Sequence, residues 1–245
     1  MRVFLRKYFL PTITLLAMVF SMGSLGHSEV IVFDRVTTVK TPIRITVLTK
    51  RRFFPAGGSL VDIYLEDDHL RKIMTGGDGY GYLKYTPLKA GFKKVTARSN
   101  SDSASGLILV MKKSEKAIII EIEEGFKDSL FSNEIMEDSR DAVNSMRKNY
   151  QIIYLSRFMG KSITGSWLEK QSFPESVVLR WRGPSTLAAL KAKGVQLHAI
   201  IGSAAVIAEA AKLIERRYTF DKTGDGKTVK SWDEILKLLQ ENPPE

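Results

Sequence analysis

Two glutamates, Glu121 and Glu123, stand directly after a short apolar run at 117–120. A run of this kind predicts a buried strand of a parallel sheet, and α/β sheets bind their ligands at the carboxyl ends of such strands. Carboxylates at that edge can act as a nucleophile, transfer a proton or bind a metal ion. This pair is therefore the first candidate for chemistry in the chain.

Other polar residues follow neighbouring predicted strands. Ser156 and Arg157 come after one strand, and Gly202 and Ser203 come after another. Because the carboxyl ends of parallel strands meet at one edge of a sheet, we expect these residues to lie close to the two glutamates.

The elements that would position these residues alternate between strand and helix from residue 113 to residue 245. Such alternation predicts an α/β domain, with a mostly parallel, Rossmann-like sheet and helices on both faces. The predicted strands are 117–122, 151–155, 176–179, 198–202 and 217–220, and the predicted helices are 133–149, 161–170, 185–193, 204–214 and 231–240.

Residues 29–112 follow a different pattern. Apolar residues alternate with polar ones, as Ile43 and Ile45 do with Arg44, and Gly, Pro and Asp separate the short runs. Short alternating strands between such turns predict an all-β sandwich. The turn-rich stretch 78–97 resembles bacterial immunoglobulin-like domains, and this resemblance implies a spacer or an adhesive surface.

The segment 1–28 differs from the rest of the chain. Three basic residues open it, and a nearly uncharged apolar run from Leu10 to Leu25 follows. Small residues at Gly26 and Ser28 suit a cleavage site, so the segment is typical of a secretory signal peptide, the alternative being an uncleaved anchor. The chain has no Cys, which excludes a disulfide framework. We expect an exported protein, periplasmic or extracellular, or one anchored to the membrane by an uncleaved leader.

Positive charge is concentrated in the first half of the chain. The net charge is +10 at pH 7, and residues 29–112 carry 14 Lys and Arg against 8 Asp and Glu, whereas residues 113–245 carry 20 against 19. A basic β-domain can attract anionic lipid headgroups or cell-surface polyanions, although a solvated, mildly basic surface gives the same counts. We expect membrane-surface contact through this domain and no nucleic-acid partner, because no stripe of Arg interleaved with aromatic residues is present.

The α/β region resembles one branch of the haloacid dehalogenase (HAD) superfamily, the lipin-type domain of phosphatidylinositol-transfer-associated proteins and related phosphatidate phosphatases. The resemblance covers about residues 117–240 and rests on the segments 150–157, 167–174, 198–203 and 230–235. It implies a Mg²⁺-dependent phosphatase fold. In active members an aspartate attacks phosphorus and binds Mg²⁺, and a second aspartate two residues later transfers the proton.

The positions of that chemistry are altered in this chain. The two aspartates fall on Glu121 and Glu123, and the threonine of the same motif falls on Gly125. The carboxylates of the last motif fall on Ser203 and Ile207. The longer glutamate side chain shifts the attacking oxygen by about 1 Å, which can cost ~10²-fold in rate, and Mg²⁺ loses part of its oxygen ligands. The resemblance therefore implies a degenerate, catalytically inactive site, a pseudophosphatase.

Other residues of the resembled site suit an anion. The resemblance places the phosphate-binding hydroxyl on Ser156 and a basic residue on Arg182. The expected ligand-binding residues are Glu121, Glu123, Ser156, Arg157, Arg182, Gly202 and Ser203. With backbone N–H groups at helix starts, such a set can bind phosphate or carboxylate without Mg²⁺. In an alternative that stays open, the two glutamates pair with Arg157 or Arg182 and no ligand binds.

The sequence leads to one favoured hypothesis and two alternatives. The favoured one is an exported binding or scaffold module for a phosphorylated ligand, an anionic small molecule or a phospholipid, with no cofactor and no catalytic residue. The first alternative is an active, phosphatidate phosphatase-like enzyme that uses Mg²⁺, with Glu121 and Glu123 as catalytic residues and metal ligands. The second alternative is a purely structural envelope protein.

Overall fold

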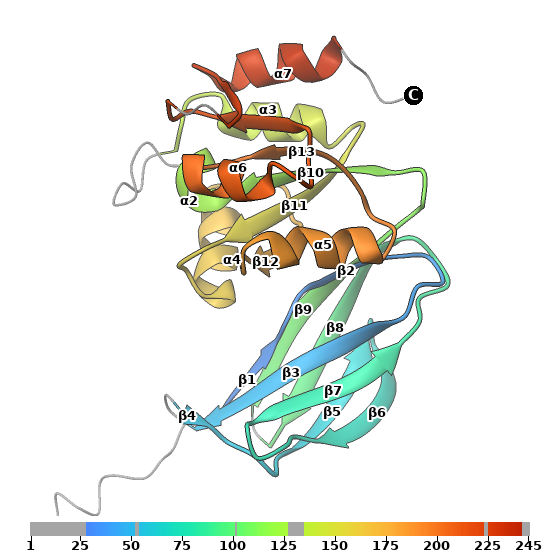
Figure 1. Ribbon diagram of the computed structural model, residues 1–245. Coiled ribbons are helices and arrows are strands. Elements are labelled where there is room, and N and C mark those ends of the chain that lie inside the picture. Colours follow the sequence, from blue (N-terminus) through green and yellow to red (C-terminus); the bar gives the residue numbers. More distant parts are fainter. Residues whose placement is uncertain (1–27, 52–53, 101, 127–134, 223–224, 242–245) are drawn as a thin grey trace, which may run out of the picture.

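The computed structural model describes residues 28–51, 54–100, 102–126, 135–222 and 225–241. Figure 1 shows two stacked units, a strand-rich unit from β1 to β9 and a unit from β10 to α7 in which strands and helices alternate. The predicted leader, apart from Ser28, lies outside the described residues. Within those residues, no helix combines the length and the apolar character needed to cross a membrane.

The first unit consists of two packed sheets. In one sheet β3 pairs with β1, β4 and β7, all antiparallel. Its strands are β1 (Ser28–Val32), β3 (Ile43–Arg51), β4 (Phe54–Pro55) and β7 (Tyr80–Tyr85). The other sheet has the order β2-β9-β8-β5-β6. Its strands are β2 (Arg35–Thr38), β5 (Leu60–Leu65), β6 (Asp68–Met74), β8 (Gly91–Ser99) and β9 (Asp102–Met111).

The alternation of apolar and polar residues along the strands explains why these two sheets pack face to face. Ile43, Ile45 and Val47 of β3 point inward and join a buried cluster with Val61 and Ile63 of β5 in the opposite sheet. The residues between them therefore point to the outer face, because successive side chains of a strand alternate in direction. The predicted N-terminal β-sandwich is confirmed.

The second unit is a six-stranded parallel sheet of order β12-β11-β10-β13-β14-β15, covered by helices. Its strands are β10 (Lys116–Glu121), β11 (Gln151–Ser156), β12 (Val178–Arg180), β13 (Gln196–Ile201), β14 (Arg216–Thr219) and β15 (Lys227–Thr228). Its helices are α2 (Ile122–Gly125), α3 (Ser139–Met146), α4 (Lys161–Lys170), α5 (Pro184–Ala192), α6 (Ala204–Ala210) and α7 (Trp232–Gln240).

The central strand β10 is buried on both faces. Ile118 and Ile120 belong to a core with α2, α3, α4 and α7, whereas Ala117 and Ile119 belong to a core with α5 and α6. A strand flanked by helices on both faces needs apolar residues at every position, and this explains the continuous apolar run that precedes Glu121. The chain order reverses at β10, between β11 and β13, where open α/β sheets form ligand crevices.

Some predicted elements differ at their ends. The predicted strand 117–122 ends at Glu121, because Ile122 already begins α2. The predicted helix 204–214 is shorter and ends at Ala210. The described part of the predicted helix 133–149 is helical only over Ser139–Met146.

A buried carboxylate holds the two units together. Asp34, between β1 and β2, accepts hydrogen bonds at 2.8 Å from the backbone N–H groups of Leu107 in the sandwich and Val178 in β12. The Lys161 ammonium, at the start of α4, lies 2.7 Å from the same carboxylate. Lys161 also donates to the carbonyl oxygen of Val32 in β1. Apolar contacts continue this junction, because Val36 of β2 belongs to one of the α/β cores.

We expect Asp34→Ala to lower the free energy of unfolding by roughly 3 kcal/mol, because it leaves two buried N–H groups and a partly buried ammonium without their acceptor. Urea denaturation measures this loss. Asp67→Ala, which removes an exposed carboxylate, is the control and should change stability by less than about 0.5 kcal/mol. Equal losses in the two variants would contradict the role given to Asp34.

Candidate functional site

Glu121 ends β10, and its carboxylate is fully buried at the carboxyl edge of the sheet. Its Oε2 accepts hydrogen bonds from the backbone N–H and the hydroxyl of Ser203, both at 2.7 Å. Its Oε1 lies 3.7 Å from Nη1 of Arg157 and has no hydrogen-bond donor among the described residues. Burial raises the pKa of Glu121 above its ordinary value, while the Ser203 hydrogen bonds and the Arg157 charge oppose the rise.

Gly202 is required by this packing. A Cβ atom at Gly202 would lie 2.6 Å from Oε2 of Glu121, closer than any carbon and oxygen atoms can approach without a shift. The glycine therefore lets the carboxylate reach the N–H group of Ser203.

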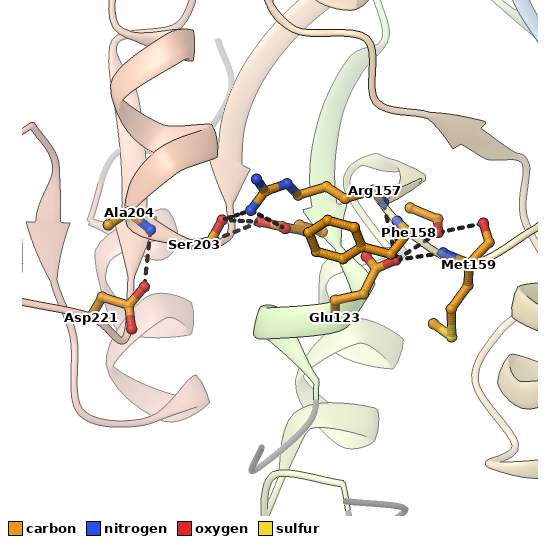
Figure 2. Close-up of polar contacts among 9 residues, drawn as sticks. Glu123, Arg157, Phe158, Met159, Ser203, Ala204 and Asp221 are labelled. Atoms are coloured by element: carbon orange, nitrogen blue, oxygen red, sulfur yellow. Dashed lines mark hydrogen bonds and ion pairs between the residues drawn. The ribbon is translucent and has the colours of Figure 1, made fainter. Parts of the chain in front are cut away.

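Glu123 lies on α2 and not on the strand. Its Oε1 accepts a hydrogen bond from the Ser156 hydroxyl at 2.7 Å, and further ones from the backbone N–H groups of Arg157 at 3.0 Å, Phe158 at 3.1 Å and Met159 at 3.4 Å (Figure 2). Successive N–H groups directed at one point form a nest that binds anions. In this chain the nest already contains a carboxylate of the protein itself.

Arg157 lies between the acidic residues and the surface. Its Nη1 donates to the Ser203 hydroxyl at 3.3 Å, and its guanidinium carbon lies 4.8 Å from the ring centroid of Phe158. Figure 2 shows this side chain extending from the β11–α4 loop toward Ser203. The guanidinium is thus held by its neighbours on both sides.

Six of the seven predicted ligand-binding residues come together at this edge: Glu121, Glu123, Ser156, Arg157, Gly202 and Ser203. Arg182 does not join them. It is exposed beyond the end of β12, and its backbone N–H donates to the Thr186 hydroxyl at 2.9 Å. The predicted pairing of Glu121 with Arg157 is present as the 3.7 Å contact.

The described residues at this edge form an acidic cluster. Burial raises the pKa of Glu124, and the negative charge of Asp221 raises it further. Asp221 accepts a hydrogen bond at 3.0 Å from the backbone N–H of Ala204, directly after Ser203 (Figure 2). Among the described residues named at this edge, carboxylates outnumber the one cation, Arg157, and a phosphate would meet negative charge from them. Among the described residues, no group of three or more His, Cys, Asp or Glu is placed to hold a metal ion.

A second polar cluster, at the junction of the two units, contains Arg182. Arg35 of β2 donates from Nη2 to the Thr46 hydroxyl at 2.6 Å and from Nε to the carbonyl oxygen of Arg44 at 3.2 Å. Burial lowers the pKa of Arg35, and the nearby positive charge of Arg182 lowers it further. Burial and the charge of Arg35 likewise lower the pKa of Lys193, so several cations meet here.

The same cluster continues on the outer face of the sandwich. Arg44 of β3 lies directly opposite Lys84 of β7, and both side chains are exposed. Like charges opposite each other on neighbouring strands destabilise a sheet. We call Arg35, Arg44, Lys84 and Arg182 the junction cations, and within the described residues none of them forms an ion pair with a carboxylate.

The sequence reasoning missed three of the junction cations. One signal was available, because Arg44 alternates with the core residues Ile43 and Ile45 and therefore had to point outward. The excess of positive charge in residues 29–112 was a second signal. The spacing of residues in the sequence does not predict that β3 pairs with β7 and that Arg44 therefore lies opposite Lys84.

Comparison with known proteins finds no matching family model and no matching curated protein. Similar solved structures include the CARDB domain of the PF1109 protein from Pyrococcus furiosus, at 17% identity over 34% of this chain and 85% of that one, with a TM-score of 0.27. The D0-D1 domain of Intimin matches at 11% identity over 38% of this chain and 56% of that one, with a TM-score of 0.29. The fibronectin(III)-like modules of Clostridium thermocellum CbhA match at 13% identity over 34% of this chain and 97% of that one, with a TM-score of 0.25.

These findings correct the family assignment made from the sequence. No family model matches, and the similar solved structures include immunoglobulin-like, fibronectin-like and CARDB domains, each matching about a third of the chain. The predicted membership of the HAD superfamily is therefore wrong. The resemblance rested on short segments at strand ends, and many parallel α/β sheets place polar residues there for geometric reasons.

We expect Glu123→Ala to lower the free energy of unfolding by roughly 3 kcal/mol, because the Ser156 hydroxyl and three backbone N–H groups lose their shared acceptor. Urea denaturation measures the loss. The control is Glu124→Ala on the same helix, where the side chain is only partly buried. A loss no larger than in the control would show that Glu123 does not hold the loop.

Glu121 should make stability fall with rising pH. Its pKa in the folded chain lies above the ordinary 4.5, so the folded state binds more protons than the unfolded state between these two pKa values. The stabilisation from this group is complete below pH 4.5 and is lost as pH rises through the folded pKa. Glu121→Gln lacks this dependence, so its stability relative to the natural chain should increase with pH. Urea denaturation from pH 4 to pH 8 tests this, and a constant difference would contradict it.

Proposed function

We propose that this chain is an exported, non-catalytic binding protein for an anionic, phosphorylated or carboxylated ligand, and that the ligand binds at the junction cations. The observation that carries this proposal is the contrast between the two polar clusters. At the sheet edge each glutamate is bound by internal donors. At the junction, by contrast, cations gather without an ion-pair partner among the described residues.

The bonding of the two glutamates supports a non-catalytic site. A general base or nucleophile needs a lone pair directed at the substrate. Oε1 of Glu123 accepts hydrogen bonds from the Ser156 hydroxyl and from three N–H groups of the β11–α4 loop, and Oε2 of Glu121 accepts two from Ser203. The second oxygen of each carboxylate has no hydrogen-bond donor among the described residues, but it is buried. Both side chains are also buried, with at most 3% of their surface exposed. These contacts fit residues that stabilise the loops around them.

The energetics of the junction support binding of an anion there. A partly buried guanidinium next to other cations is unfavourable, as the lowered pKa of Arg35 indicates. A bound carboxylate, sulfate or phosphate would relieve this repulsion and could accept paired hydrogen bonds from the arginines. The Asp34 carboxylate, which is near Arg35, is already bound to Lys161 at 2.7 Å.

The junction also supports a preformed site. Arg35 belongs to the sandwich and Arg182 to the α/β unit, and the Asp34 contacts fix one unit against the other. Thr38 and Lys193 extend these contacts through a hydrogen bond of 2.7 Å from the Thr38 hydroxyl to the Lys193 carbonyl oxygen. A site assembled before binding avoids part of the entropy cost of ordering side chains.

The test uses sodium tripolyphosphate as a compact anionic probe in isothermal titration calorimetry at low salt. We expect the natural chain to bind it, and Arg44→Ala/Lys84→Ala to weaken binding roughly tenfold, which is about 1.4 kcal/mol. The double variant should fold normally, because it removes a like-charge pair. Arg71→Ala/Lys237→Ala removes the same residue types from exposed sites on β6 and α7 and should change affinity less than about twofold. No binding by the natural chain, or equal weakening in both variants, would refute the proposal.

A further inference from the structure

A row of aromatic rings lies on the outer face of the sandwich. The rings of Phe33 and Tyr80 have centroids 6.1 Å apart and planes 19° from parallel. The rings of Tyr80 and Tyr82 are 6.3 Å apart with planes 9° from parallel. Three nearly parallel rings in succession are therefore presented on one surface.

Strand pairing places this row across β3. The backbone N–H of Phe33 donates to the Thr46 carbonyl oxygen on one side of β3, and Tyr80 lies opposite Leu48 on the other side. Leu48 points outward and yet is only 6% exposed, which is consistent with cover by the two rings. Tyr82, the next residue on that face of β7, is 53% exposed.

The row is continuous with the junction cations. Tyr82 lies opposite Thr46, whose hydroxyl accepts the hydrogen bond from Arg35. Two residues further along, on the same face, Lys84 lies opposite Arg44. The surface thus changes from aromatic to cationic along one direction. Figure 1 shows β3 and β7 in front of the other sandwich strands, with no described element covering them.

We propose that this face binds a linear acidic polysaccharide, whose sugar rings pack on Phe33, Tyr80 and Tyr82 and whose acidic groups pair with the junction cations. This inference rests on the proposed function and names its ligand class. An aromatic face carries negative charge density and attracts the C–H groups on the flat side of a sugar ring. The tyrosine hydroxyls supply hydrogen bonds to sugar hydroxyls, and guanidinium groups bind carboxylate or sulfate through paired donors.

The distribution of charge favours a polysaccharide over a single-stranded nucleic acid. A nucleic acid carries a phosphate about every 3.4 Å along each strand, so its aromatic platforms are accompanied by cations along their whole length. Among the described residues whose side chains alternate toward this face, the cations without an ion pair, Arg44 and Lys84, lie at one end of the aromatic row. Lys50, the next cation along β3 in the other direction, lies 3.9 Å from Glu29. A ligand with sugar rings at one end and acidic groups at the other matches this arrangement.

The test is isothermal titration calorimetry of the full chain with a polygalacturonate hexasaccharide. We expect the natural chain to bind it and Tyr82→Ala to weaken binding at least tenfold. The matched control is Phe92→Ala, which removes a 41% exposed ring from β8 and should change affinity less than twofold. Tyr82 is exposed enough that its removal should leave the fold intact, and circular dichroism verifies this for each variant.

Two further probes separate failure of this inference from failure of the proposed function. Tripolyphosphate should bind the natural chain and Tyr82→Ala with affinities within twofold of each other, because the rings do not contact a compact anion. If tripolyphosphate binds but the hexasaccharide does not, or if Tyr82→Ala leaves hexasaccharide affinity unchanged, the polysaccharide inference is overturned and the anion site stands. Tighter binding of a ten-residue oligothymidylate than of the hexasaccharide would overturn it in favour of nucleic acid. If neither tripolyphosphate nor hexasaccharide binds, both proposals fail.

Discussion

The Asp34 carboxylate is the interaction on which the arrangement of this molecule depends. It binds an N–H group of each unit and the ammonium of Lys161. A movement of the sandwich against the α/β sheet would therefore break these hydrogen bonds and the ion pair. Val178 belongs to β12, an edge strand, and Asp34 satisfies an N–H group that no neighbouring strand could reach. With this contact in place, Arg35 and Arg182 are held near each other although they belong to different units.

The charged groups of the two polar clusters have different partners. At the sheet edge one oxygen of Glu121 and one oxygen of Glu123 accept hydrogen bonds from the loops that follow β13 and β11, and these bonds tie the loops to the sheet. At the junction Arg35 donates to neutral oxygen atoms, and none of the junction cations forms an ion pair with a carboxylate among the described residues. Burial disfavours the charged form in both clusters, but at the junction like charges also gather without an ion pair among the described residues, which is more consistent with anion binding than with folding alone.

Much of the fold could be predicted from the sequence, and the errors have specific causes. The apolar runs and turn residues located most strands and helices, since the periods of two and of 3.6 residues are local properties. The same locality misled the family assignment. Polar residues occur at strand ends in many parallel sheets. The short segments around Ser156 and Gly202 were therefore wrongly interpreted as motifs of the HAD superfamily. Arg182 was assigned to the site from its distance along the chain to Gly202, but in the structure its charge acts on Arg35 at the junction.

The sequence by itself determined that Glu121, Glu123, Ser156 and Ser203 would share one edge, because chain order and parallel pairing bring strand ends together. Only the tertiary structure decided what they do there. The loop after β11 turns three N–H groups onto Glu123, and no spacing rule encodes that turn. Likewise, the facing of Arg44 and Lys84 depends on the register between strands about 40 residues apart in the chain. Packing of the whole sandwich sets this register, so the sequence of either strand alone does not predict which residues face each other.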